Sequence, residues 1–323
     1  MQARARARAN IALVKYWGKS DAALNIPAVG SISITLDGLW SDTEIEFDSK
    51  LTHDSLLLDG KEDATQLRRV TTCLDLLRRE ADVEMPARVV SHNNFPTGAG
   101  LASSASGFAA LVGAATAALG LERSPTELSI LARRGSGSAA RSVFGGFVEM
   151  HVGEASDGND SYATPLLAAD DWPLHVVIAV TETGAKATSS TKGMQSSEAT
   201  SPFYRAWVES SPADLDAARS AIVSHDFDKL GEVAEHSCMK LHALAMTSRP
   251  PILYWNPATL ACIDAVRALR RSGVPVFFTI DAGPQLKAVC LPEATDRVAA
   301  ELHDVSGVVD VLVTGLGPGL EMG

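Results

Sequence analysis

The feature that most limits how this chain can fold is a long uncharged stretch, residues 89–121, made mainly of glycine, alanine and serine. It contains no Asp, Glu, Lys or Arg, and it is interrupted by Asn93, Asn94 and Pro96. A membrane-spanning helix needs about 20 mostly large apolar residues, so these small residues and interruptions exclude one. We expect instead a strand, a glycine-rich turn and a closely packed helix.

The glycine-rich turn, residues 96–107 (PTGAGLASSASG), has the composition of an anion-binding loop. Glycines let backbone N–H groups point inward, and the helix expected over 101–119, with Gly120 as its C-cap, adds partial positive charge at its start. The hydroxyls of Ser103 and Ser104 lie in its first turn, where they can ligate Mg²⁺ or contact phosphate. No GK[ST] sequence follows, so this is not a Walker loop; a turn that only permits close helix packing is the alternative.

The length of 323 residues suggests about two domains, and the order of the expected elements makes both of them α+β. Over residues 153–173 the composition turns to Asp, Gly, Ser, Asn and Pro, so we divide the chain into domains 1–172 and 173–323. Strands are expected at 9–17, 31–37, 43–48, 87–95, 143–150, 174–181, 274–280 and 308–314. Helices are expected at 65–80, 101–119, after 124–125, in two or three pieces over 203–246, and at 257–272.

The N-terminal residues alternate arginine with alanine, which predicts a strand with Arg4, Arg6 and Arg8 on its solvent face. The whole chain carries 28 Lys and Arg against 39 Asp and Glu, a net charge of −11. This balance argues against binding to nucleic acid or to an anionic membrane, but a few basic residues can still make a pocket for a small anion. The four cysteines are far apart with no CxxC pair, so we expect no disulfide or zinc site, and a cytoplasmic location.

Serine, glycine and basic residues recur in three further segments. In residues 133–142 (RRGSGSAARS), Ser136, Ser138 and Arg141 have a spacing that suits a phosphate or carboxylate, although a surface turn alone would look the same. Lys15 and Lys19 flank two aromatic residues at the end of a strand, and Gly18 between them suggests close approach of another group to the backbone. These lysines can equally be solvated.

A loop expected over residues 183–197 carries Lys186, Ser189 and Ser190, which could close over phosphates or be simply exposed. Asp281 ends an apolar strand before a Gly-Pro turn. A carboxylate there is a candidate acid–base group, with a turn former or helix N-cap as the alternative. Taken together, these segments suggest phosphoryl transfer to a small anionic molecule, but the residues alone do not name that molecule.

In their order along the chain, these segments resemble the GHMP small-molecule kinase superfamily and, within it, the diphosphomevalonate decarboxylase family. The resemblance covers nearly the whole chain, and its most specific motifs are KYWGK, NNFPT followed by GLASSA, GSGSAARS followed by GGFVE, and DAGP. It implies a ribosomal-protein-S5-like N-terminal domain with the glycine–serine phosphate loop, a ferredoxin-like C-terminal GHMP domain, ATP with Mg²⁺ between them, and a homodimer.

The reaction implied by the resemblance is ATP-dependent phosphorylation of the 3-hydroxyl of mevalonate 5-diphosphate, followed by loss of phosphate and CO₂ to give isopentenyl diphosphate. Asp281 matches the catalytic aspartate, as base or orienting group, and Lys15 matches the lysine that keeps it ionised. Ser104, with Ser103 beside it, matches the serine for ATP phosphate and Mg²⁺. The residues implied for substrate binding are Asn10, Tyr16, Lys19, Arg69, Ser136, Ser138 and Arg141. Those implied for ATP are Asn93, Pro96, Gly98, Ala99, Gly100, Leu101, Ala102, Ser103, Ser104, Lys186, Ser189 and Ser190.

Two positions depart from the family pattern. Gly98 stands where many relatives have alanine, which should be harmless. Ser20 stands where relatives often have arginine, so one positive charge is missing near the 5-phosphate end. A decarboxylase acting on mevalonate 5-phosphate therefore stays open as an alternative, as does a GHMP kinase without decarboxylation. A ligand sensor without activity is disfavoured because every matched residue is intact.

Overall fold

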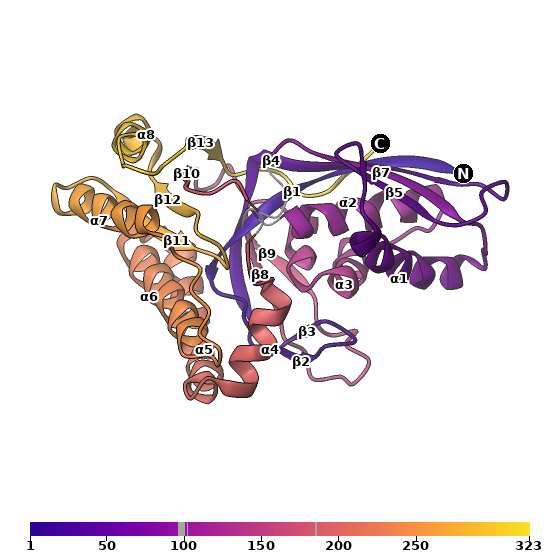
Figure 1. Ribbon diagram of the computed structural model, residues 1–323, viewed down its shortest axis with the longest axis horizontal. Helices are drawn as coiled ribbons and strands as arrows, with labels where there is room; N and C mark the ends of the chain where they lie inside the picture. Colours follow the sequence, from indigo (N-terminus) through magenta and orange to yellow (C-terminus); the bar gives the residue numbers. More distant parts are fainter. Residues whose placement is uncertain (96–100, 102, 185) are drawn as a thin grey trace.

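The chain is described by a computed structural model that covers residues 1–95, 101, 103–184 and 186–323. Two sheets, each with helices packed against it, lie side by side along the long axis of the molecule (Figure 1). This is the α+β architecture expected from the sequence. The predicted ATP-binding residues Pro96, Gly98, Ala99, Gly100 and Ala102 lie outside the described residues.

The first sheet has eight strands and is built on the long antiparallel pair of β1 and β4. Its order is β14-β1-β4-β7-β5-β6, and β8 and β9 extend it from β4. The bounds are β1 Gln2–Val14, β4 Ser31–Phe47, β5 Ser55–Leu58, β6 Lys61–Glu62, β7 Ala87–Asn93, β8 Phe147–Met150, β9 Ala163–Leu167 and β14 Glu321–Met322. A small separate ribbon pairs β2 (Lys19–Asp21) with β3 (Ile26–Pro27).

Two expectations for this sheet were wrong. The strands predicted at 31–37 and 43–48 are one strand, β4, because the residues between them form an irregularity in the pairing with β1 rather than a turn. Arg4 and Arg6 do lie toward solvent and pair with Asp42, but Arg8 is buried. Its guanidinium pairs with Asp37 and Glu321, because the C-terminal end of the chain returns to cover it.

Three helices cover one face of the first sheet (Figure 1). They are α1 (Ala64–Ala81), α2 (Ser103–Ala118) and α3 (Pro125–Gly135), and the 3₁₀ helix η1 (Gly137–Val143) follows α3. Helix α2 is the uncharged helix of the sequence, and it is buried on nearly all sides because its small side chains let β1 and β4 approach closely. Residues 133–142 are therefore the end of α3 and a largely buried η1, not a flexible surface turn.

The second sheet is antiparallel with the order β11-β12-β10-β13. Its strands are β10 His175–Val180, β11 Val276–Ile280, β12 Leu286–Cys290 and β13 Asp310–Gly315, and its helices are α4 Ser190–Thr200, α5 Tyr204–Val223, α6 Phe227–Met246, α7 Pro257–Arg271, η2 Pro292–Ala294 and α8 Thr295–His303. The sequence did not predict β12 or α8. The expected loop over 183–197 is helical from Ser190, because Ser189 caps α4 by accepting from the Lys192 N–H.

The two halves of the chain pack directly against each other. Helix α6 lies against β1, and one hydrophobic cluster contains Ile11 and Leu13 of β1 together with Leu230 of α6 and Phe277 of β11. The chain passes from the first sheet to the second between β9 and β10, and β14 rejoins the first sheet beside β1. The division at 172/173 stays a prediction.

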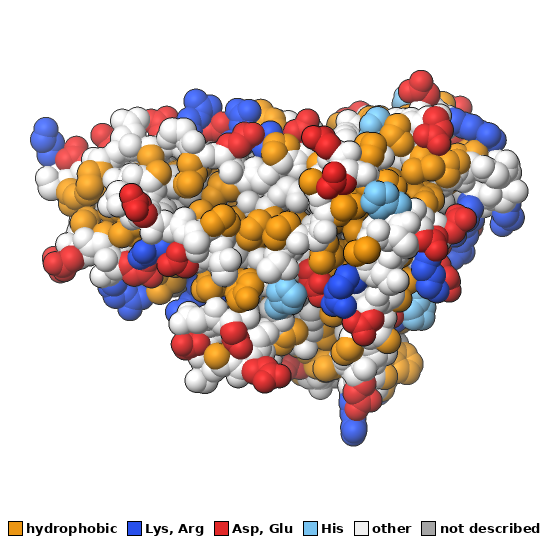
Figure 2. Space-filling model, turned by 180° about the vertical axis from the view of Figure 1, so that it is seen from behind, with side chains coloured by type: hydrophobic (Ala, Val, Ile, Leu, Met, Phe, Trp, Pro, Cys, Tyr) orange, Lys and Arg blue, Asp and Glu red, His pale blue; other side chains and the backbone are white. Residues whose placement is uncertain are grey.

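The surface seen from behind mixes side chains of every type (Figure 2). Lys and Arg side chains are dispersed there among Asp and Glu, mostly toward the edges of the view. Among the described residues, no helix is both long and apolar enough to cross a membrane.

Candidate active site

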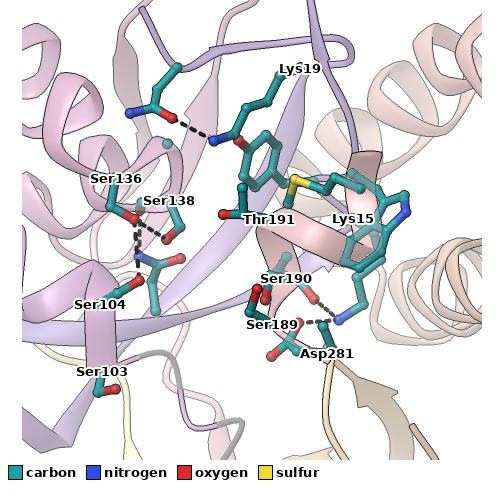
Figure 3. Close-up of a pocket in the computed structure, with 18 of the residues that line it drawn as sticks. Lys15, Lys19, Ser103, Ser104, Ser136, Ser138, Ser189, Ser190, Thr191 and Asp281 are labelled. Atoms are coloured by element: carbon teal, nitrogen blue, oxygen red, sulfur yellow. Dashed lines mark hydrogen bonds and ion pairs between the residues drawn. The ribbon is translucent and has the colours of Figure 1, made fainter. Parts of the chain in front are cut away.

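A cavity of about 400 Å³ lies where the two halves meet, and most of the predicted site residues line it (Figure 3). Side chains reach it from the end of β1, from the starts of α2 and α4, from η1 and from the residue after β11. The predicted residues among its walls are Asn10, Lys15, Tyr16, Lys19, Arg69, Ser103, Ser104, Ser136, Ser138, Arg141, Lys186, Ser189, Ser190 and Asp281.

At one side of this cavity, Asp281 is held between two lysines. Lys15 Nζ donates to Asp281 Oδ1 at 2.7 Å and to the Ala12 carbonyl oxygen at 2.7 Å. Lys287 Nζ lies 3.3 Å from Asp281 Oδ2. Both lysine side chains are 1% exposed, whereas the Asp281 side chain is 24% exposed. The carboxylate therefore faces the cavity, with Lys15 beside it in the cavity wall and Lys287 behind it.

Burial by itself would raise the pKa of Asp281, but the charges and hydrogen bonds of Lys15 and Lys287 outweigh it, so the pKa lies well below its usual range. The nearby His242 is also buried, and desolvation, aided by the Lys15 charge, lowers its pKa to about 3. His242 is therefore neutral at physiological pH, and its Nε2 lies 3.3 Å from the Ile280 carbonyl oxygen. Buried and neutral, His242 has a packing role in the core.

Arg141 presents a buried cation to the same cavity. Its side chain donates to Asn10 Oδ1 at 3.2 and 3.1 Å and to Ser31 Oγ at 2.5 Å, and it is 2% exposed. No carboxylate pairs with it in the part of the chain that the structure describes, and desolvation lowers its pKa to about 10. A guanidinium buried with only neutral partners is a site prepared for an anion.

The far end of the cavity carries two more cations. Lys19 Nζ donates to Asn25 Oδ1 at 2.6 Å, and Arg69 donates to Gln66 Oε1 at 2.9 Å and to the Gly135 carbonyl oxygen at 3.2 Å. Desolvation, together with the nearby Arg69 charge, lowers the pKa of Lys19. Within residues 1–95, 101, 103–184 and 186–323, neither cation forms an ion pair with a carboxylate.

Serine hydroxyls connect the two walls of the cavity. Ser104 Oγ lies 3.2 Å from Ser136 Oγ, which lies 3.4 Å from Ser138 Oγ. Between them, a Cβ at Gly137 would collide with the phenol oxygen of Tyr16, so a glycine is needed there. Gly18 likewise admits a close neighbour, as the sequence suggested, but that neighbour is Tyr204 of α5.

The remaining predicted ATP-binding residues, Lys186, Asn93 and Leu101, lie in different parts of the structure. Lys186 Nζ donates to Ser190 Oγ at 2.9 Å and to the Ala282 carbonyl oxygen at 2.7 Å, and desolvation lowers its pKa to about 8. Asn93 does not line the main cavity: it lines a second, largely apolar hollow of about 80 Å³ with Ser103 and Ser104 at its edge. Leu101 is buried in the core, so its side chain has a packing role.

Some residues of the site were not predicted. Lys287, Asn25 and Gln66 had no motif of their own, although a single lysine inside the apolar run LKAVC was a usable signal for Lys287. Ser20 does not line the cavity, and its hydroxyl donates to the Pro27 carbonyl oxygen at 3.3 Å.

The residues present fit ATP and Mg²⁺ through serine hydroxyls and a helix N-terminus, not through a cluster of metal-binding side chains among the described residues. The described residues hold no cluster of three His, Cys, Asp or Glu side chains that could bind a metal on its own. Helix α2 begins at Ser103 with no acidic residue in its first turn, which suits phosphate. Ser103 and Ser104 could supply hydroxyl ligands to Mg²⁺, with phosphate oxygens completing its coordination.

Comparison with known protein families gives two matches that together span most of the chain. Residues 7–163 match the diphosphomevalonate decarboxylase-like N-terminal domain, and residues 176–312 match the mevalonate 5-diphosphate decarboxylase C-terminal domain. The diphosphomevalonate decarboxylase of Candida albicans is 38% identical, over 96% of this chain and 94% of that protein. That of Saccharomyces cerevisiae is 38% identical, over 93% of this chain and 80% of that protein.

Solved structures of this kind superpose on the whole chain. Mevalonate diphosphate decarboxylase from Staphylococcus aureus has a TM-score of 0.93 at 37% identity, with 99% of this chain and 97% of that chain covered. A structure described as MDDEF in complex with MVAPP, AMPPCP and magnesium has a TM-score of 0.93 at 38% identity, with 100% and 99% covered.

Proposed function

The chain belongs to the diphosphomevalonate decarboxylase family, and we propose that it converts mevalonate 5-diphosphate to isopentenyl diphosphate in an ATP-dependent reaction. The observation that carries this assignment is the pairing of Asp281 with Lys15 and Lys287 in the same cavity as Arg141. An ionised carboxylate and a buried cation without a carboxylate partner are the two groups that a phosphorylation followed by a decarboxylation requires.

The cations of the cavity bind the substrate. Lys19 and Arg69 hold the diphosphate at one end, with Tyr16 beside them. Arg141, oriented by Asn10, grips anionic oxygens of the substrate together with Ser136 and Ser138. A diphosphate matches two cations that lack carboxylate partners among the described residues better than a monophosphate does.

ATP lies across the start of α2. Ser103 and Ser104 contact its phosphates, Lys186 adds a positive charge, and Ser189 and Ser190 lie at the N-terminus of α4 on the opposite wall. The apolar hollow beside Ser104 would take the base. When bound, Mg²⁺ neutralises phosphate charge, and Ser103 and Ser104 are the residues that would hold it.

Asp281 orients the 3-hydroxyl and accepts its proton as the γ-phosphoryl group is transferred to the oxygen. Because its pKa is strongly lowered, Asp281 is a weak base, so the proton moves late and orientation is its main contribution. Hydroxide is a poor leaving group and phosphate a good one. When the C–O bond to phosphate breaks, the electrons of the bond to the carboxylate form the double bond and CO₂ leaves.

The decisive experiment measures CO₂ release in parallel from mevalonate 5-diphosphate and mevalonate 5-phosphate, with and without ATP. We expect release that requires ATP and strongly favours the diphosphate. Preference for the monophosphate would assign the alternative substrate. A stable 3-phosphorylated product without CO₂ would show a kinase and refute the decarboxylase.

The cellular setting is part of the same proposal. All four cysteines are buried and unpaired, which supports a reducing cytoplasm. The homodimer implied by the family resemblance stays a prediction, and sedimentation of the purified protein would test it.

A further inference from the structure

Lys287 is a buried charge that the reaction described above does not use directly. It lies in β12, whose five residues are all buried, and its side chain is 1% exposed. It does not line the cavity, so it cannot touch a bound substrate. Burying an ammonium group costs free energy unless the group is paired with an opposite charge. The burial of Lys287 therefore needs a physical explanation.

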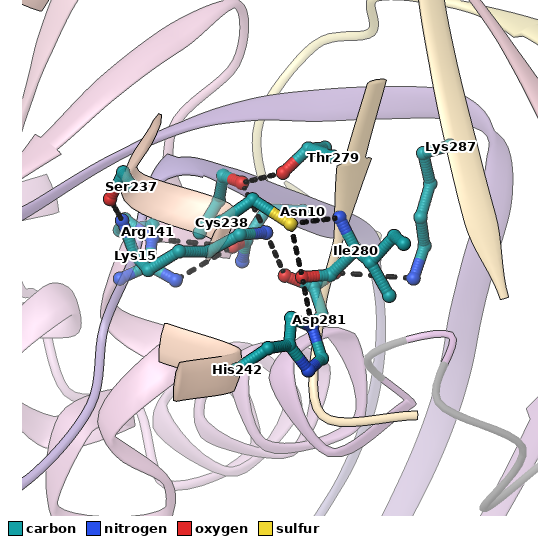
Figure 4. A network of polar contacts seen from close by, with 11 residues as sticks. Asn10, Lys15, Arg141, Ser237, Cys238, His242, Thr279, Ile280, Asp281 and Lys287 are labelled. Atoms are coloured by element: carbon teal, nitrogen blue, oxygen red, sulfur yellow. Dashed lines mark hydrogen bonds and ion pairs between the residues drawn. The ribbon is translucent and has the colours of Figure 1, made fainter. Parts of the chain in front are cut away.

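The pairing of β11 with β12 explains where Lys287 points. Lys287 lies directly opposite Thr279, and Asp281 follows two residues after Thr279, on the same face of the hairpin. Lys287 thus reaches Asp281 Oδ2 diagonally, at 3.3 Å, while Lys15 holds Oδ1 at 2.7 Å. Figure 4 shows the two lysines approaching the carboxylate from opposite sides.

We propose that Lys287 is a positioning residue for the reaction: it fixes the Asp281 carboxylate toward the cavity and keeps it ionised when anionic substrates are bound. This role rests on the proposed function. The two bound substrates bring several negative charges close to Asp281, and like charges favour the protonated carboxyl. The charge of Lys15 alone would only neutralise the Asp281 carboxylate. With Lys287 as well, the three side chains together carry a net positive charge.

The other charged or titratable groups that face Asp281 cannot replace Lys287. Lys186, before α4, and Arg141, from η1, both line the cavity, where ligand anions engage them. His242 of α6 is neutral at physiological pH, and burial raises the pKa of the Cys238 thiol on the same helix. Lys15 already donates a hydrogen bond to Asp281 Oδ1. Lys287 is therefore the charge partner that no ligand can reach.

The test compares three variants by the ratio of their kcat to that of the unaltered enzyme, measured as CO₂ release between pH 8 and pH 5. Titration of the substrates is common to all of them and cancels in the ratio. Lys287→Met removes the charge, Lys287→Arg keeps it, and Thr279→Val removes a neighbouring hydroxyl, bonded to the Ala12 carbonyl oxygen, without changing charge.

Loss of an opposite charge at this distance raises a carboxyl pKa by about 1–3 units, and the negative charges of the bound substrates, no longer offset, raise the pKa of Asp281 further toward pH 5. We therefore expect the ratio for Lys287→Met to fall about threefold or more from pH 8 to pH 5, with KM values nearly unchanged. The ratios for Lys287→Arg and Thr279→Val should stay flat. A flat ratio for Lys287→Met, whatever its absolute value, overturns the proposal.

Folding is checked by thermal unfolding, and Lys287→Gln replaces Lys287→Met if the latter does not fold. Failure of both, with Lys287→Arg folded, would show a purely structural role and also overturn the proposal. Absence of CO₂ release from the unaltered chain would instead refute the proposed function, so the two failures are distinguishable.

Discussion

Replacing Asp281 by asparagine tests the centre of the site. The side chain keeps its size, but the negative charge and basicity beside the 3-hydroxyl are lost. Loss of a group that orients the reacting hydroxyl costs about 10² in rate, and loss of its proton acceptor about 10²–10⁴, or roughly 3–5 kcal/mol of activation free energy. We expect kcat for CO₂ release to fall at least about a hundredfold, with KM for ATP and substrate changing only a few-fold.

The same substitution also unbalances the charges around residue 281. Two ammonium groups, at 2.7 and 3.3 Å from the carboxylate and each with a side chain 1% exposed, lose their counter-ion. Removing one partner of a buried pair typically costs about 3–5 kcal/mol. The cost in unfolding free energy should lie at or below this range, because Lys287, whose pKa burial already lowers, can release its proton.

A second variant separates these two effects. Adding Lys287→Met to Asp281→Asn restores the net charge of the group, so we expect thermal stability to recover while activity stays low. Stopped-time CO₂ release and thermal unfolding are measured on both proteins. A folded Asp281→Asn protein with more than about a tenth of normal activity would refute the catalytic role. Recovery of activity in the double variant would show that the charge imbalance, and not the loss of the carboxylate itself, had lowered the activity.

Three further outcomes follow from the geometry. Arg141→Ala should raise the activation free energy by about 2–5 kcal/mol and Arg69→Ala by about 0–1 kcal/mol, because Arg141 is buried and Arg69 is exposed. Steady-state kinetics that show the larger loss for Arg69→Ala would contradict this placement. Ser104→Ala should lower kcat roughly tenfold to hundredfold with KM for ATP within about threefold, and normal turnover with weakened ATP binding would show the role to be wrong. Because the pKa of Lys186 is lowered to about 8, the amine is charged below that pH and neutral above it. We expect kcat/KM for ATP to fall about tenfold from pH 7 to pH 9, and Lys186→Ala to remove that dependence.

Much of the fold follows from local sequence signals. Helices α1 and α3 lie where apolar spacing and a Ser-Pro start placed them, and α3 has the capping box that Ser124 and Glu127 form. Strands β7, β8, β10 and β11 likewise match alternating or apolar runs. These elements are decided by neighbours within a few residues, so periodicity and capping residues are sufficient to predict them.

Elements that depend on distant partners were not predictable in the same way. Two separate runs, 31–37 and 43–48, made β4 look like two strands, yet pairing with β1 on both sides of the irregularity keeps it continuous. Arg8 looked solvent-facing because its own strand alternates, but the C-terminal segment covers it. Both outcomes depend on contacts with residues far away in sequence.

The functional site likewise combines features that the sequence predicts with features that depend on the tertiary structure. The sequence by itself determined which chemical groups are available: the serines of the phosphate loop, the basic residues, and Asp281 at a strand end. Only the tertiary structure decided how they are charged and paired, because Lys15 and Asp281 are 266 positions apart and meet where the two halves of the chain pack together. Lys287 shows this most clearly: in the sequence it is one lysine in an apolar strand, and its meaning comes from the hairpin register that places it behind the carboxylate.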